Sequence, residues 1–249
     1  MRKVVYTVLT GNYDPLRQPE LVAEDWEYIC FTDRDGQDGV WQLKKIALET
    51  PDPVRRARYV KLQPHTSLSA YDYSLFMDAN LCITGPELYE KADAAIAQGV
   101  LLAALPHPER DCVYDELRYC YLKDKIGTRA ALRHHRLLEE RRMPRHAGLY
   151  ETNVLLRRHG DPAVVALDNA WWEAFNACCN RDQLSFTPVL SLAPFLLFGP
   201  RGNARNVPYV RYSLHPSRGE RIPGRWNWPN LQYNLRLLWR KCVLRLCLR

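Results

Sequence analysis

Short runs of apolar residues alternate with longer stretches of helical periodicity over most of the chain. The runs are rich in β-branched and aromatic residues, and near-continuous apolar segments of this kind are typical of strands buried on both faces. We expect strands at residues 4–9, 28–32, 74–77, 100–105 and 152–156. Helical periodicity marks residues 55–62, 87–97, 129–142 and 163–177. This largely βαβ order predicts an α/β fold with a mostly parallel, doubly wound sheet and flanking helices.

The chain has 249 residues, which is enough for one domain with a substantial core. We expect that domain to span residues 1–217, with the short apolar run at 195–198 completing its core. Residues 200–229 are rich in Gly, Pro, Arg and Asn, so they are predicted to form a long irregular segment. Residues 218–249 then combine the end of this segment with a basic amphipathic C-terminal helix.

The C-terminal helix carries apolar residues at helical spacing, with basic residues on its other side. Its apolar stripe consists of Leu231, Leu235, Leu238, Trp239, Cys242, Val243 and Leu246. A basic amphipathic helix with tryptophans at its start is typical of docking on an anionic membrane surface. Packing of the stripe on the domain is the equal alternative, because amphipathicity serves both purposes.

The formal net charge of +7 favours anionic partners such as a nucleoside diphosphate, an acidic glycan or an anionic membrane. No nucleic-acid-binding motif and no Gly-x-Ser-x-Gly motif of a lipid hydrolase occurs, so neither activity is expected. Cys30 and Cys82 lie in apolar runs typical of buried thiols, and the first residues contain no signal-peptide pattern. We therefore expect a cytoplasmic protein. No cysteine and histidine spacing is typical of zinc, so no structural zinc site is expected.

Polar residues follow the predicted strands, at the edge where α/β sheets bind ligands. They are residues 10–14 after the first strand, Asp33 after the second, Asp78 and Asn80 after the third, and His107 after the fourth. Asp78 and Asn80 would offer two oxygen ligands to Mg²⁺ or Mn²⁺, with diphosphate oxygens completing the shell. An Asp-x-Asn turn without a metal has the same sequence.

Two further groups of residues have a chemical and a purely structural interpretation. Arg58 and Lys61 lie at i and i+3 on one face of a predicted helix, where they would bind a diphosphate or simply face solvent. Asp182 and Gln183 begin a later apolar helical pattern. Asp182 would orient or deprotonate an acceptor hydroxyl, or else cap the helix.

The pattern His-Pro-x-Arg occurs twice, with His107 and Arg110 and with His215 and Arg218. Either pair would supply a metal ligand and a phosphate contact. Only convergence with Asp78 in space would give them that role, because surface histidines are usually not functional.

Taken together, these segments resemble a glycosyltransferase-like domain family that is represented in plant mucilage-pectin biosynthesis proteins and has bacterial relatives. The order and spacing of the blocks carry the resemblance. The blocks are residues 5–7 with 10–14, 28–33, 58–61 with 64–65, 77–80, 107–110, 148–152 and 181–186. The arrangement is also similar to the retaining glycogenin and lipooligosaccharide galactosyltransferase families. The resemblance implies a GT-A fold.

The resemblance also implies a role for each candidate residue. Thr7 and Asp33 would lie near the nucleotide, and Arg58 and Lys61 near the diphosphate or sugar, with His107 and Arg110 also at the donor. Asp78, Asn80 and His215 would bind the metal, and Asp182 and Gln183 would lie near the acceptor and the donor sugar. Asn80 replaces the second acid of the usual Asp-x-Asp motif, and a neutral amide binds a divalent cation less strongly.

We therefore expect a glycosyltransferase that moves a sugar from a nucleoside diphosphate donor, a UDP-sugar, to a hydroxyl of a glycan or lipid-linked glycan in surface polysaccharide or lipopolysaccharide synthesis. It would work at the inner face of the cytoplasmic membrane. The resemblance favours retention of anomeric configuration. A non-catalytic sugar-nucleotide or glycan-binding protein of the same fold is the alternative.

Overall fold

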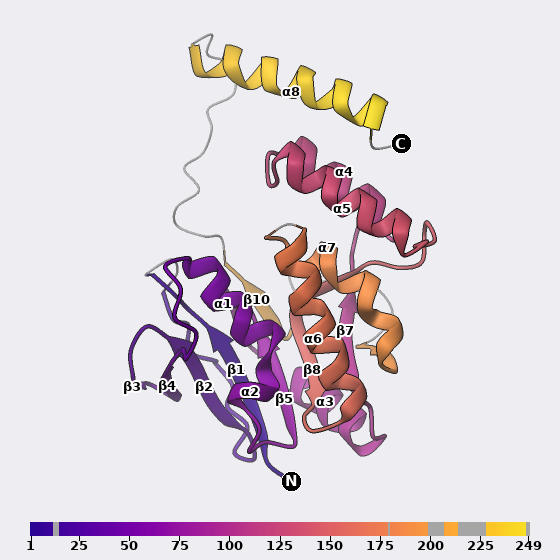
Figure 1. Ribbon diagram of the computed structural model, residues 1–249. Coiled ribbons are helices and arrows are strands. Elements are labelled where there is room, and N and C mark those ends of the chain that lie inside the picture. The colour runs from indigo at the N-terminus through magenta and orange to yellow at the C-terminus, as the bar shows by residue number, and fades with distance from the viewer. Residues whose placement is uncertain (12–14, 179, 199–206, 214–227, 248–249) are drawn as a thin grey trace.

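The computed structural model describes residues 1–11, 15–178, 180–198, 207–213 and 228–247 (Figure 1). Three residues of the polar segment after the first strand, at 12–14, lie outside this part of the chain, as do His215 and Arg218. The boundary expected between residues 217 and 218 also falls outside it.

An eight-stranded sheet forms the centre of the molecule, with the strand order β3-β4-β2-β1-β5-β8-β7-β9. The strands are β1 (Lys3–Val8), β2 (Glu27–Thr32), β3 (Gly36–Asp38), β4 (Trp41–Lys45), β5 (Tyr73–Met77), β7 (Leu102–Pro106), β8 (Tyr150–Arg158) and β9 (Phe195–Leu197). Within this sheet, the pairs β3–β4, β5–β8 and β7–β8 are antiparallel, and the other described pairs are parallel. The predicted α/β class with a mostly parallel sheet is confirmed, with β8 reversed between two parallel strands.

A second sheet of two antiparallel strands pairs β6 (Leu81–Ile83) with β10 (Val210–Tyr212). The prediction that residues 200–229 are irregular throughout is therefore wrong for β10. A three-residue strand held by a distant partner leaves little periodicity in its own sequence.

The helices are α1 (Pro53–Leu62), α2 (Pro64–Ser67), α3 (Glu87–Ala97), α4 (Val113–Leu122), α5 (Thr128–Glu140), α6 (Pro162–Ala177), α7 (Asp182–Phe186) and α8 (Trp228–Cys247), with a 3₁₀ helix at Thr187–Leu192. The four helical stretches that the periodicity predicts are confirmed as α1, α3, α5 and α6. Helices α1 and α6 begin alike, because Asp52 and Asp161 cap them and a proline occupies the first turn.

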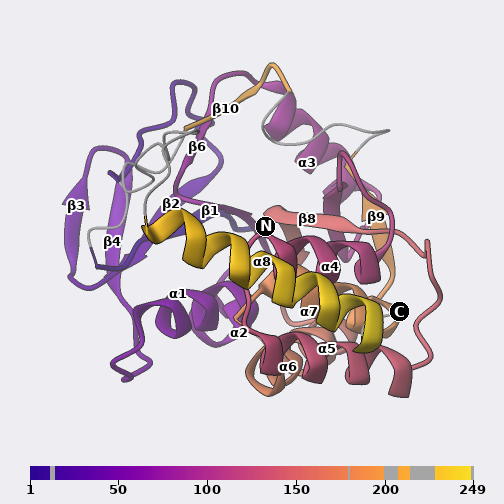
Figure 2. The same ribbon diagram turned by 90° about the horizontal axis from the view of Figure 1, so that it is seen from above.

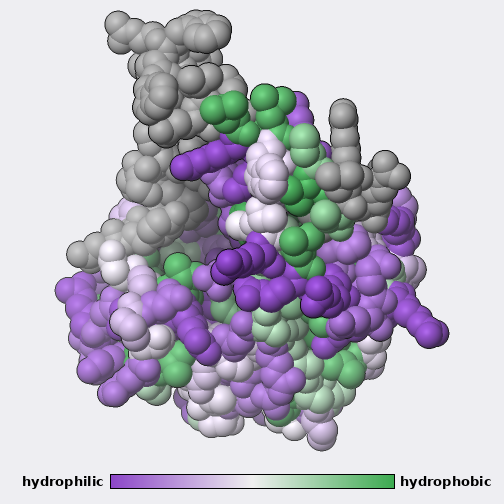
Figure 3. Space-filling view, turned by 45° about the horizontal axis from the view of Figure 1, so that its top comes forward, coloured by the Kyte–Doolittle hydropathy of each residue, from purple (hydrophilic) through white to green (hydrophobic). Residues whose placement is uncertain are grey.

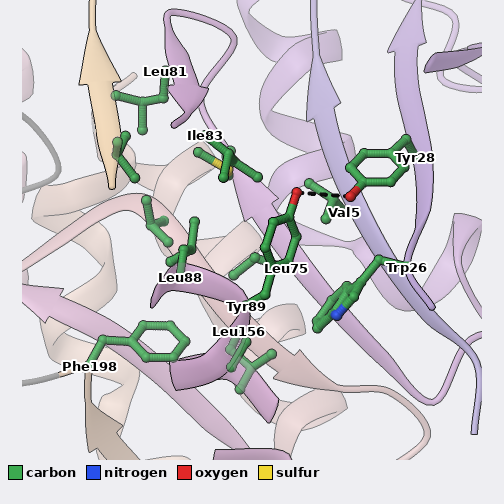
Figure 4. Close-up of a cluster of buried hydrophobic side chains, with 14 of the residues drawn as sticks. Val5, Trp26, Tyr28, Leu75, Leu81, Ile83, Leu88, Tyr89, Leu156 and Phe198 are labelled. Atoms are coloured by element: carbon green, nitrogen blue, oxygen red, sulfur yellow. Dashed lines mark hydrogen bonds between the residues drawn. The ribbon is translucent and has the colours of Figure 1, made fainter. Parts of the chain in front are cut away.

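Alternate residues of each strand pack on opposite faces of the sheet. On one face, Val5 and Leu75 contact α3, where the hydroxyls of Tyr28 and Tyr89 share a hydrogen bond of 2.8 Å (Figure 4). On the other face, residues such as Tyr6 pack against α1 and α6. Apolar layers thus cover both faces of the sheet, and the ends of its strands lie at the edges, where a ligand can reach them.

Helix α8 lies over α4 (Figures 1 and 2). Val243 is buried there, and Arg240 forms an ion pair with Asp124. In contrast, Leu235, Leu238 and Trp239 are 57%, 59% and 64% exposed. The helix therefore packs on the domain along one side and leaves part of its apolar stripe uncovered. No helix in the described part of the chain is long and apolar enough to cross a membrane.

A buried ion pair lies between the sheet and α6. Arg157 of β8 and Asp168 of α6 are both fully buried, and Nε of the arginine lies 3.3 Å from Oδ1 of the aspartate. Arg157 also donates to the carbonyl oxygen of Lys61 at 2.7 Å, and Gln63 donates to that of Asp168 at 2.7 Å. This network ties the end of α1 to β8 and α6.

Asp168→Ala is expected to lower the free energy of unfolding by about 3–5 kcal/mol, because it leaves the Arg157 guanidinium buried without its carboxylate. Urea unfolding followed by circular dichroism measures the change. Glu173→Ala, at an exposed position of the same helix, is the control and should stay within about 0.5 kcal/mol of the parent. Equal losses in the two variants would contradict this account.

Candidate functional site

The candidate site lies where β1 and β5 end and α1 crosses above them. Thr7 near the end of β1 and Asp78 directly after β5 line the same hollow, together with Arg17 and Trp41. Thr7 is buried, and its hydroxyl makes no hydrogen bond within the described part of the chain. Of the polar groups predicted to follow the strands, this hollow contains Asp78, which is joined there by Thr7 from within β1.

Lys61 joins two of the predicted carboxylates. Its Nζ lies 2.5 Å from Oδ2 of Asp182 and 3.4 Å from Oδ1 of Asp78. It also donates to the hydroxyl of Thr152 at 3.2 Å, and this hydroxyl donates to Oδ2 of Asp182 at 3.1 Å. The Lys61 side chain is only 1% exposed. It is enclosed by these oxygens and is not open to solvent.

Arg58 lies one turn earlier on α1, and its Nε is 3.5 Å from Oδ1 of Asp182. The prediction that Arg58 and Lys61 share a helix face is confirmed, because both contact the same carboxylate. The Arg58 side chain is 27% exposed, and that of Asp78 is 34% exposed. These two groups are the members of the cluster that a ligand can reach from solvent.

The charges around Asp182 determine its protonation. Burial by itself would raise the pKa of this carboxyl, but the charges of Arg58 and Lys61, the hydrogen bond from Lys61 and the charge of Arg181 lower it well below its usual range. Asp182 is therefore ionised at neutral pH. Such a carboxylate is a weak base, so the geometry favours an electrostatic role over proton abstraction.

Arg181, and not Asp182, occupies the N-cap position of α7, so the alternative that Asp182 caps the helix is wrong. The Asp182 side chain instead turns toward α1, while its backbone carbonyl accepts a hydrogen bond of 2.9 Å from Nε1 of Trp171. Gln183 is half-buried and donates to the carbonyl oxygen of Tyr150 at 3.1 Å. Strand β8 therefore holds the start of α7 next to the site.

Asp33 takes part in a different contact at the same sheet edge. Its carboxylate lies 2.8 Å from Nη2 of Arg56 and accepts the backbone N–H of Gly11 at 2.7 Å. These contacts tie the end of β2 to α1 and to the segment after β1. Asp33 thus lies at the same edge of the sheet, but among the described residues it forms no ion pair with Lys61.

His107 and Arg110 lie beside α4. Nε of Arg110 donates to Glu116 at 2.6 Å, and the backbone N–H of Arg110 donates to Nδ1 of His107 at 3.0 Å. Glu116 is 2% exposed, so this ion pair holds the start of α4 against the end of β7. No contact among the described residues links Arg110 to Asp78 or Asp182.

The donor atoms at Asp78 and Asn80 fit a hard divalent cation. One carboxylate and one amide supply oxygen ligands, which Mg²⁺ and Mn²⁺ prefer. Asn80 also donates from Nδ2 to the carbonyl oxygen of Ser213 at 3.3 Å, so its side chain is oriented by the β6–β10 pair. The predicted third ligand, His215, lies outside the described residues.

Thr152 belongs to this cluster of the candidate site, although its position in the sequence predicted no such role. Its sequence context contains one indication of a polar partner: Thr152 lies in the apolar run of β8, and a buried hydroxyl there needs a hydrogen-bonding group nearby. Its two partners, Lys61 and Asp182, are distant in sequence, so only the folded chain identifies them.

No protein-family model and no curated protein sequence matches this chain. Among solved structures, the apo WbbM bifunctional glycosyltransferase is similar at a TM-score of 0.45 and 11% identity, over 77% of this chain and 38% of that one. The chain thus covers less than half of the WbbM chain. The apo form of mouse xyloside xylosyltransferase 1 is similar at a TM-score of 0.45 and 11% identity, over 78% of this chain and 83% of that one.

Asp182→Asn is expected to destabilise the protein at neutral pH, and this destabilisation should decrease as the pH falls below about 4. The pKa of Asp182 is lowered by folding, so its charge contributes stability above the unfolded value near 3.9, and the contribution falls as pH decreases below it. Urea unfolding of parent and variant between about pH 6 and pH 3 measures the difference. Glu173→Gln, at an exposed site, is the control, and its difference in stability from the parent should not change over this pH range. A pH-independent difference for Asp182→Asn would refute the assignment.

Proposed function

We propose that this protein is a glycosyltransferase of the GT-A type that moves a sugar from a nucleoside diphosphate donor to a hydroxyl of a glycan or lipid-linked glycan. The observation that carries the proposal is the cluster of Asp78, Lys61, Asp182 and Arg58 at the carboxyl edge of the sheet. This edge is where open α/β sheets bind ligands. The sequence blocks that resemble glycosyltransferases contain all four residues.

The donor would lie over the hollow lined by Thr7 and Asp78, with its diphosphate next to α1. Arg58 is partly exposed and has the planar donor geometry that suits phosphate oxygens. Asp78 and Asn80 would hold Mg²⁺ or Mn²⁺, which when bound neutralises negative charge on a departing diphosphate. Because the hollow also contains Trp41 and Arg17, it offers an apolar and a polar surface to a nucleoside.

Lys61 would act by positioning its neighbours. It is buried and engaged with two carboxylates and a hydroxyl, so it does not reach the donor directly. It holds Asp78 and Asp182 at defined positions and compensates their charge. Groups fixed in this way need little reorganisation as charge develops during transfer.

Asp182 would stabilise the positive charge that develops at the anomeric carbon, since glycosyl transfer passes through an oxocarbenium-like state. Its ionised state at neutral pH supports this role. Gln183, held by the carbonyl of Tyr150, would lie at the donor sugar. Retention of configuration belongs to the proposal through the resemblance of this Asp-Gln pair to retaining enzymes.

Asp78→Ala is expected to reduce sugar transfer by at least about 100-fold while leaving the fold intact, because it removes the reachable carboxylate of the cluster. The measurement is release of nucleoside diphosphate from a panel of UDP- and other nucleotide sugars with Mn²⁺ and candidate acceptors. Asp35→Ala is the control, because this exposed carboxylate binds the backbone N–H of Lys45 instead.

A metal-stimulated Asp78→Ala protein with parental turnover would overturn the site assignment. The alternative is a non-catalytic sugar-nucleotide or glycan-binding protein of the same fold, and Asn80 bears on it only by weakening the metal site. Isothermal titration with UDP and Mn²⁺ separates the two functions. Binding that depends on Asp78, without hydrolysis or transfer for any donor, would support the alternative.

We also propose that α8 attaches the protein to an anionic lipid surface, which would bring residues 1–217 close to a lipid-linked acceptor at the inner face of the cytoplasmic membrane. Figure 3 shows hydrophobic side chains gathered at the upper part of the molecule, where α8 lies. The exposed residues Leu235, Leu238 and Trp239 lie on one side of the helix. Helix α8 has no acidic residue and four basic ones, so its charge complements anionic headgroups.

Leu238→Glu is expected to weaken binding to vesicles that contain an anionic phospholipid, because it places a negative charge within the exposed stripe. Co-sedimentation with anionic and with purely zwitterionic vesicles measures the change, and added salt should weaken parental binding. Leu192→Glu is the matched control, since Leu192 is also exposed, at 47%, but lies in the 3₁₀ helix. Parental sedimentation of Leu238→Glu, or no lipid binding by the parent, would contradict the proposal.

A further inference from the structure

We propose a second metal site, of the zinc type, at the base of the α4–α5 hairpin, formed by Cys112, Asp115 and His146. One ligand atom of each residue lies within 4.8 Å of those of the other two. The three are a thiol, a carboxylate and an imidazole ring. The site is separate from the proposed donor site and does not depend on the proposed glycosyltransferase function.

The ligand types select the metal. A cysteine thiolate together with a histidine nitrogen favours Zn²⁺ and other borderline-soft ions over Mg²⁺ or Mn²⁺, which prefer oxygen alone. Zn²⁺ takes four ligands, so three protein groups leave one position for water. Binding releases the proton of the Cys112 thiol, because the thiolate is the ligand. This site therefore differs in chemistry from the oxygen ligands of Asp78 and Asn80.

Asp111 orients the histidine. Its Oδ1 lies 2.8 Å from Nδ1 of His146, so this nitrogen carries the proton in the neutral ring and Nε2 keeps the lone pair. A carboxylate that accepts a hydrogen bond from a metal-binding histidine fixes the ring and increases its basicity. The carbonyl of Asp111 also accepts the backbone N–H of Gly148 at 2.9 Å, which brings the two ends of the hairpin segment together.

The local fold explains why the residues meet. Cys112 is the N-cap residue of α4 and is buried, and Asp115 lies one helical turn later. His146 comes after α5, with a backbone φ of 56°, and is exposed. A metal would therefore close the hairpin from a buried thiol on one side and a surface histidine on the other. These ligands do not follow zinc-finger spacing, so their spacing along the chain does not indicate a zinc site.

Such a metal would act as a structural clamp. Glu116, directly after Asp115, binds Arg110, and its other oxygen accepts the thiol of Cys120 at 3.1 Å. Leu184 of α7, two residues along the chain from Asp182, packs in the same buried apolar cluster as Val113 and Leu117 of α4. Fixing the start of α4 would thus help to hold the segment from which Asp182 projects.

The test uses the full chain, stripped with a chelator, incubated with Zn²⁺ and dialysed before its metal content is measured by mass spectrometry. We expect one retained zinc per chain. Loading with Co²⁺ should produce the intense near-ultraviolet absorption of a cobalt–thiolate bond. Cys112→Ser should lose this absorption, and His146→Ala should lose retained zinc. Because His146 is exposed, its variant remains informative even if the buried Cys112→Ser does not fold.

Asp111→Asn should weaken zinc affinity by about 10–100-fold, since it alters only the partner of the histidine. Cys242→Ser, at an exposed free thiol of α8, is the control and should keep both zinc and the cobalt absorption. Asp78→Ala should also keep them, which separates this site from the donor site. No retained zinc in the parent, or unchanged zinc in His146→Ala, would overturn the proposal.

Discussion

The salt bridge between Lys61 and Asp182 joins parts of the chain that are far apart in sequence, and the arrangement of the site depends on it. Lys61 is almost fully buried at the end of α1, and Asp182 is buried at the start of α7. Two charges in such a place are stable only when paired and hydrogen-bonded. Thr152 and Arg58 complete the pairing, so that α1, β8 and α7 are held in one relative position.

Strand β8 provides the support for this interaction. Thr152 near its start bonds the ammonium group of Lys61, and Arg157 near its end donates to the backbone carbonyl of the same residue. Arg157 in turn pairs with Asp168 of α6, beneath the sheet. A single reversed strand thus holds Lys61 by its side chain and its backbone. Because these polar contacts are buried, the electrostatic attraction in each is stronger than it would be in water.

The four residues of the cluster differ in how far their side chains are exposed to solvent, and their proposed roles differ accordingly. Arg58 and Asp78 are open to a ligand, whereas Lys61 and Asp182 are enclosed. The charges of Arg58 and Lys61 keep Asp182 ionised, while Arg58 and Asp78 present one positive and one negative group at the sheet edge. In the proposed donor site, a charged ligand would contact the two exposed residues, and the two buried residues would supply positioning and an electrostatic field.

Much of the fold followed from local patterns. Periodicity alone predicted β1, β2, β5, β7 and β8 and the helices α1, α3, α5 and α6, because alternation and 3.6-residue spacing are properties of a short window. The i, i+3 spacing of Arg58 and Lys61 likewise placed both on one helix face. Helix α4 was not predicted, since its tyrosines and cysteine have weak helix propensity. The segment containing β10 was expected to be irregular, since that strand forms only against β6.

Local patterns were sufficient to identify an α/β protein in which Asp78 and Asn80 follow a buried strand. The direction of β8, the partners of Asp182 and Thr152, and the proximity of Cys112 to His146 became known from the folded chain alone. The difference lies in the range of the interactions. Periodicity and helix capping are set by neighbours within a turn or two, whereas charge pairing and ligand clustering depend on which distant segments the packed core brings together.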